Sequence, residues 1–136
     1  PDGETDAYEA RVFDRNLAAV SAGVERLQTF RGRVAATLAE LRAHPDWKVV
    51  LWGANDNLVK MLPGRETLPN ALLVDSDPRK TNYHPAMNAL LPGDALDALR
   101  SADRLILFTR LHASQILHWI EEHAGRRFDD AVIVDY

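Results

Sequence analysis

Residues 48–62 read KVVLWGANDNLVKML, and this stretch decides the fold. Its first part is a run of β-branched and apolar residues that predicts a short buried strand, and Gly53 begins a turn. Apolar residues start again at Leu58, with a spacing that favours a helix. The stretch therefore predicts a strand, a turn and a helix. In open α/β sheets this unit places backbone N–H groups at the carboxyl edge of the sheet, where nucleotides and phosphates bind.

Three more apolar runs predict strands, over residues 71–74, 105–108 and 131–134. Because parallel strands need long crossover connections, four such strands separated by helices or long loops predict a mostly parallel, three-layer, Rossmann-like α/β sheet. Right-handed crossovers would place the strand at Val49 in the centre. The switch point of the sheet would then lie between this strand and the strand at Leu105.

The remaining segments after residue 62 predict two helices and two irregular connections. One helix is expected from Asp94, as its N-cap, to Arg100, and the other from about Ala113 to His123 with Gly125 closing it. Residues 63–70 read as a loop, and residues 81–93 as irregular chain with a short strand or a single turn.

A long helix is predicted before the sheet, from about Thr5 as N-cap to Ala43, where His44, Pro45 and Asp46 stop it. Part of it should project, and its interior glycines predict a bend or break near Gly32. Residues 1–44 therefore form a linker or packing helix, and residues 45–136 form the α/β domain. Apolar residues recur at steps of four and three, interrupted by Arg31, at Phe13, Leu17, Val20, Val24, Leu27, Val34, Leu38 and Leu41. This stripe fits either a helix that covers a core or one that associates with itself or with another domain.

Composition excludes several classes of function. The chain has 136 residues, 46% hydrophobic and 26% charged, which predicts one compact soluble domain. Its formal net charge of −4 with scattered basic residues predicts no nucleic-acid or membrane partner. No apolar run is long enough to span a bilayer, and no signal-peptide pattern is present. The absence of cysteine excludes disulfides and thiolate sites and leads us to expect a cytoplasmic location. The chain begins at Pro1, as a piece of a longer protein would.

The carboxyl ends of the first three predicted strands supply the candidate ligand-binding residues, which are Gly53, Asn55, Asp56, Asn57, Asp75, Ser76, Lys80, Thr109, Arg110 and His112. Asp75 lies about 20 residues beyond Gly53, where a dinucleotide-binding fold carries a ribose-binding acid, although an aspartate at a strand end also begins an Asx turn. The glycine-rich fingerprint is degraded, because Asn55 and Leu58 stand where its other glycines would be. Asn55 and its two neighbours could bind a ligand or cap the next helix, and capping is favoured.

The other polar residues support no catalytic assignment. Lys80, with Arg79 and Arg110, could meet a phosphate. His112 could orient a substrate or act in proton transfer, but a surface or capping role is favoured. His84 could line the mouth of the site, although a role without a ligand is again favoured. His118 and His123 do not share a helix face, so no zinc site is expected. The tryptophans at 47, 52 and 119 are interpreted as core or interface residues. No hydrolase motif is present.

Residues 30–136 resemble the carboxy-terminal Rossmann-like domain of sugar C-methyltransferases, and similar modules accompany other polysaccharide-modifying enzymes. The resemblance is carried by the helix with Phe30, Val34, Leu38 and Leu41, by the segments VVLWGA (49–54), LVDSDPRK (73–80) and LILF (105–108), and by the helix of Ile116. It implies a domain that packs against a separate methyl-donor domain and helps to hold a nucleotide-linked sugar. This chain would then be an accessory nucleotide or nucleotide-sugar binding module of a sugar-modifying transferase, with a neighbouring catalytic domain or partner protein.

Two alternatives remain open from sequence. A degenerate Rossmann fold could serve assembly without any ligand, as a homodimer through the amino-terminal helix or docked to a partner domain. A small enzyme that uses NAD or a methyl donor is the other alternative, and the missing glycines argue against it.

Overall fold

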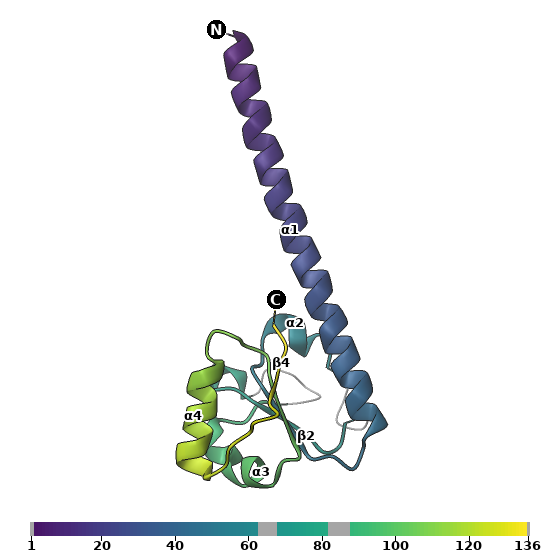
Figure 1. Ribbon diagram of the computed structural model, residues 1–136, viewed down its shortest axis with the longest axis vertical. Coiled ribbons are helices and arrows are strands. Elements are labelled where there is room, and N and C mark those ends of the chain that lie inside the picture. Colours follow the sequence, from purple (N-terminus) through teal and green to yellow (C-terminus); the bar gives the residue numbers. More distant parts are fainter. Residues whose placement is uncertain (1, 63–67, 82–87, 136) are drawn as a thin grey trace.

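The structure is a computed structural model that describes residues 2–62, 68–81 and 88–135, with residues 2–6 described as backbone only. A single long helix leads into a mixed α/β domain (Figure 1). In chain order the elements are α1 (Asp2–Ala43), β1 (Val49–Trp52), α2 (Asp56–Val59), β2 (Ala71–Val74), the 3₁₀ turns η1 (Pro78–Lys80) and η2 (Pro92–Ala95), α3 (Leu96–Ser101), β3 (Arg104–Leu107), α4 (Ala113–Ala124) and β4 (Val132–Ile133).

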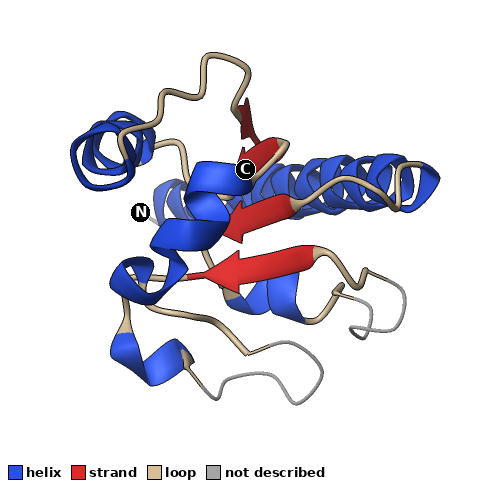
Figure 2. Ribbon diagram, turned by 90° about the horizontal axis from the view of Figure 1, so that it is seen from below, coloured by secondary structure: helices blue, strands red, loops and turns tan. Residues whose placement is uncertain are grey.

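The four strands form one sheet in the order β2-β1-β3-β4, and every pair is parallel (Figure 2). Val50 lies between Leu72 of β2 and Leu105 of β3 in the register. The prediction of a parallel sheet with the first strand in the centre is therefore confirmed. The chain leaves β1 toward β2 on one side and later returns to β3 on the other, so the sheet has its switch point between β1 and β3.

Alternating side chains of β1, β2 and β3 enter two separate hydrophobic clusters. Val49 and Leu51 of β1 pack with residues of α1 and α2, whereas Val50 and Trp52 pack with residues of α3 and α4. Successive side chains of a strand point to opposite faces, so a strand that is apolar at every position must be covered on both faces. This explains why β1 is buried at all four positions.

The helix α1 runs without interruption from Asp2 to Ala43, so the predicted bend or break near Gly32 is wrong (Figure 1). Phe30 and Val34, on either side of this glycine, are fully buried against the sheet. The cost of one glycine in a helix interior is about 1 kcal/mol, which the packing of two such side chains exceeds. The predicted start at Thr5 is also wrong, because the helix already includes this residue.

Other boundaries differ by smaller amounts. The third strand begins one residue earlier than predicted because Arg104 pairs with Val49, and the last strand pairs only at Val132 and Ile133. Asp94 does not cap α3. The preceding 3₁₀ turn contains it, and α3 follows Ala95 without a side-chain cap. The predicted end of α4 is confirmed, because Gly125 adopts the left-handed conformation with φ of 64°.

Some predictions fall outside the described residues. These are residues 63–67 of the predicted loop and residues 82–87 of the irregular segment, which include His84. Within the described part of the irregular segment, Leu90 forms a single parallel bridge to Val74, and Pro92 and Gly93 belong to the 3₁₀ turn η2. Within the described part of the chain, none of the helices has the length and apolar character needed to cross a bilayer.

Two glycines give opposite predictions for alanine substitution. Gly53 has φ of +115° and an added Cβ would lie 3.3 Å from Phe108 Cβ, so Gly53→Ala should lower the free energy of unfolding by about 1–3 kcal/mol. Gly32 lies in a helix with nothing within 4 Å of an added Cβ, so Gly32→Ala should raise it by about 0.5–1 kcal/mol. Urea denaturation measures both, and equal effects of the two substitutions would contradict this difference in local geometry.

Candidate functional site

A cleft of about 720 Å³ opens at the carboxyl ends of β1, β2 and β3, beside α4. Its lining comes from the end of β1, the connections after β1, β2 and β3, one side of α4 and the chain after β4. The lining residues are Trp52, Gly53, Ala54, Asn55, Asp75, Ser76, Asp77, Lys80, Pro92, Phe108, Thr109, His112, Gln115, Ile116, Trp119 and Asp135. The cleft therefore lies at the switch point of the sheet, where ligands of open α/β folds bind.

The polar groups of the turn after β1 form hydrogen bonds with other groups of the protein. The Gly53 N–H donates to the carbonyl of Val74 at 2.8 Å, and the Ala54 N–H donates to Asp75 Oδ2 at 2.7 Å. Asn55 Oδ1 accepts from the Leu58 N–H at 2.8 Å and caps α2, which confirms the capping prediction. Because these N–H groups already have acceptors, this turn differs from a glycine-rich phosphate cradle.

Asp75 joins the ends of β1 and β2. Its Oδ2 accepts from Ala54, and its Oδ1 accepts from the N–H of Asp77 at 2.8 Å. The second bond is the Asx turn that the sequence offered as one of two interpretations. The carboxylate is only partly buried and lines the cleft. Its remaining lone pairs could accept a ligand hydroxyl, so the structural role leaves room for contact with a ribose or sugar.

The turn after Asp75 carries two ion pairs. Arg79 donates from Nε and Nη2 to the Asp77 carboxylate, which holds the pKa of Asp77 below its ordinary value of 3.8. Arg79 is not among the residues that line the cleft. The Lys80 ammonium lies 3.7 Å from Asp56 Oδ1 and also lines the cleft. Among the described lining residues, Lys80 is therefore the lysine or arginine best placed to meet a phosphate.

Only some residues of the loop after β3 line the cleft. Thr109 and His112 line the cleft, but Arg110 is exposed and does not. The backbone N–H of Arg110 donates to Asp135 Oδ2 at 2.7 Å, which ties this loop to the chain after β4. His112 Nδ1 lies 3.3 Å from Gln115 Oε1, so the ring is oriented by an amide and not by a carboxylate.

Most of the predicted site residues meet in one place. The cleft brings together Gly53, Asn55, Asp75, Ser76, Lys80, Thr109 and His112. Asp56, Asn57 and Arg110 are not among its lining residues, although Asp56 contacts it indirectly through Lys80.

An aromatic wall of the cleft was not predicted as part of a site. Trp52 and Trp119 pack edge to face, with ring centroids 5.8 Å apart, and Trp119 stacks on His123 at 4.4 Å. Ile116, one turn before Trp119 on α4, also lines the cleft. Ile116 and Trp119 are three residues apart, so the sequence places them on one face of the helix. Only the position of α4 beside the strand ends turns that face toward the cleft.

The lining is more acidic than basic. Asp75, Asp77 and Asp135 line the same cleft as Lys80, together with aromatic and aliphatic side chains. Carboxylates accept hydrogen bonds from hydroxyl groups, and aromatic rings stack on flat or apolar ligand faces. The site is therefore suited to a neutral, hydroxyl-bearing group in its interior, with a negative charge accommodated near Lys80. The described residues contain no cluster of histidine and acidic side chains that could hold a metal ion.

The double hydrogen bond of Asp75 predicts a stability effect. In Asp75→Asn the side chain keeps one acceptor oxygen, so either the Ala54 or the Asp77 N–H loses its partner, which should lower the free energy of unfolding by about 1–2 kcal/mol. Ser76→Ala, a change at the exposed neighbouring residue, should have an effect within about 0.5 kcal/mol. Chemical denaturation of both variants provides the measurement, and equal stability of Asp75→Asn and the parent chain would contradict the assigned role.

Comparisons of the chain with protein-family models, with curated proteins and with solved structures found no match. The resemblance to the carboxy-terminal domain of sugar C-methyltransferases therefore remains a prediction. A function for this chain has to be inferred from the geometry and the charges of its cleft.

Proposed function

We propose that this chain is a Rossmann-like, three-layer accessory domain that binds a nucleotide or nucleotide sugar for a catalytic domain elsewhere. The observation that carries the proposal is the cleft at the switch point between β1 and β3. Its volume of about 720 Å³ lies within the range of about 300–1,000 Å³ that is typical of small-molecule sites. Its combination of an aromatic wall and a few convergent polar groups is also typical of such sites.

The charges of the cleft favour one orientation of the ligand. Three carboxylates line the cleft, so a pyrophosphate in its interior would meet like charges. We infer that the nucleoside or sugar occupies the interior against Trp119, with hydroxyl groups near Asp75 and Asp135. The phosphates would then lie toward Lys80.

A binding role fits the described residues better than catalysis. His112, the histidine in the cleft, contacts Gln115 and not an acid that would orient it as a general base. The carboxylates of Asp75 and Asp135 each accept a backbone N–H and so position loops. These contacts support a site that holds a ligand for chemistry supplied by another domain.

A second function, assembly through α1, is favoured by a different observation. Large apolar side chains on the amino-terminal part of this helix are exposed, including Phe13, Leu17 and Val20. No residue of α1 is among those that line the cleft, so binding and assembly can be tested separately.

Thermal unfolding with a panel of ligands tests the binding proposal. The panel contains UDP-glucose, GDP-mannose, the two nucleoside diphosphates and the free hexoses. A ligand present at about 100 times its dissociation constant should stabilise the chain by about 2.7 kcal/mol. We expect a nucleotide or nucleotide sugar to raise the melting temperature while free hexoses have a smaller effect. A panel without any shift at millimolar concentration would contradict the proposal.

Two substitutions test the inferred orientation by calorimetric titration of the ligand that binds. Trp119→Leu keeps an apolar side chain but removes the aromatic face, and should weaken binding about 5- to 100-fold, as expected for loss of one stacking contact. His118→Ala, at the exposed neighbouring position, is its matched control. Lys80→Gln should weaken phosphate-bearing ligands and leave the free nucleoside unchanged. Equal weakening of nucleoside and nucleotide by Lys80→Gln would contradict the assigned orientation.

A further inference from the structure

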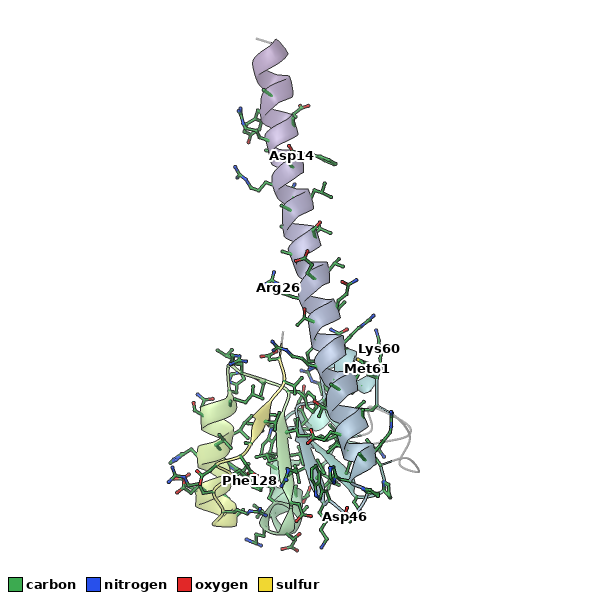
Figure 3. All side chains as sticks on the ribbon, turned by 45° about the vertical axis from the view of Figure 1, so that its right-hand side comes forward. Asp14, Arg26, Asp46, Lys60, Met61 and Phe128 are labelled. Carbon is green, nitrogen blue, oxygen red and sulfur yellow. The ribbon has the colours of Figure 1, made fainter. Side chains whose placement is uncertain are left out.

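The amino-terminal part of α1 carries an uncovered apolar stripe. Phe13 is 66% exposed, Leu17 55%, Val20 63% and Val24 49%. This part of the helix projects beyond the α/β domain, and the side chains of Asp14 and Arg26 mark it in Figure 3. Helices of globular proteins gain most of their stability from packing of an apolar face. Here that face has no cover within the described chain.

The same stripe is covered farther along the helix. Val34, Leu38 and Leu41 continue the steps of four and three, and all are buried against the sheet and α2. In heptad terms Leu17 and Val24 occupy a positions, and Phe13, Val20 and Leu27 occupy d positions. A stripe restricted to a and d positions is the narrow seam of a coiled coil, not the broader face that covers a globular core.

We propose that two copies of this chain pair through an antiparallel coiled coil of α1, with the twofold axis between residues 18 and 19. In this register Leu17 meets the partner's Val20. Phe13 meets the partner's Val24, and Ala10 meets the partner's Leu27. Each layer joins an a position to a d position. The arrangement uses every stripe residue from Ala10 to Leu27, and the same patch serves both copies, as a twofold interface requires.

The charges favour the antiparallel direction. In a parallel pair each g position faces an e position of the next heptad, so Glu9 would face the partner's Asp14 on both sides of the seam. Arg31, an exposed residue at an a position, would also face its own copy. In the antiparallel register Asp14 instead faces the partner's Ser21, and Asn16 faces the partner's Gly23. The like-charge contacts of the parallel pair are thereby removed.

The length of the seam also fits a second copy. The uncovered stripe ends near Leu27, and Phe30 is already fully buried against its own domain. The paired layers of the antiparallel seam, from Ala10 to Leu27, end at this point, where the covered part of the stripe begins. It also places the two α/β domains toward opposite ends of the paired helices.

Sedimentation equilibrium of the full chain tests the association. Leu17→Glu/Val20→Glu places charges in the two central layers, and should raise the dimer dissociation constant by at least about 100-fold, because a charge buried without a partner is strongly disfavoured. Ala18→Glu/Ala19→Glu adds the same charge at exposed positions outside the seam and should leave the dimer intact. All four positions lie on the projecting helix, so the thermal unfolding of the α/β domain serves as a check that each variant folds.

A monomeric parent chain, or a dimer that resists Leu17→Glu/Val20→Glu, would overturn the proposal. Equal loss of the dimer in both double variants would overturn it as well, because the seam would then not be the contact surface. Ligand binding in the cleft should be unchanged by the seam variants, so failure of this proposal is distinguishable from failure of the binding proposal.

Thiol cross-linking tests the direction of the helices, since the natural chain has no cysteine. Ala10→Cys and Leu27→Cys variants are prepared separately, mixed and oxidised. The antiparallel register predicts a mixed disulfide between residue 10 of one copy and residue 27 of the other. A parallel pair would instead give disulfides between identical positions, which are adjacent in a parallel seam. Predominance of these homotypic products would overturn the antiparallel arrangement.

Discussion

The structure depends on the parallel pairing of β1 between β2 and β3. Val49–Trp52 is buried at every position and pairs with a strand on both sides. The pairing continues beyond the strand, because the Gly53 N–H donates to Val74 and the Phe108 N–H donates to the carbonyl of Trp52. These bonds bring the loops after three strands to one edge. Gly53, with its positive φ, lets the chain turn where it passes close to Phe108.

The cleft at that edge is shaped by carboxylates that have structural partners. Asp75 joins the turn after β1 to the turn after β2, and Asp135 joins the loop after β3 to the end of the chain. The same groups make the lining acidic. This constraint explains why a degraded glycine fingerprint and a usable cleft occur together: the backbone N–H groups that would hold a phosphate elsewhere are occupied here, and the polar atoms left to a ligand are mostly oxygen acceptors.

The apolar stripe of the long helix, interrupted by Arg31, lies in two environments. From Phe30 to Leu41 its stripe is part of the core, while from Phe13 to Val24 the same pattern is exposed. The buried part, from Phe30 to Leu41, fixes the helix on the α/β domain. The exposed part, from Phe13 to Val24, projects from the domain.

The sequence by itself determined the local structure of this protein. Four short apolar runs, the Asn55 cap, the Asx turn at Asp75 and the Gly125 helix end follow from residue type and spacing, because side-chain period and turn chemistry act over a few residues. Parallel pairing with β1 in the centre followed as well, since crossover handedness leaves few alternatives. Only the tertiary structure decided the rest. It placed Trp119 and Asp135 in the cleft, left Arg110 outside it, and kept α1 straight through Gly32. Each of these depends on contacts between segments far apart in the chain, whose energies exceed local propensities and leave no local pattern in the sequence.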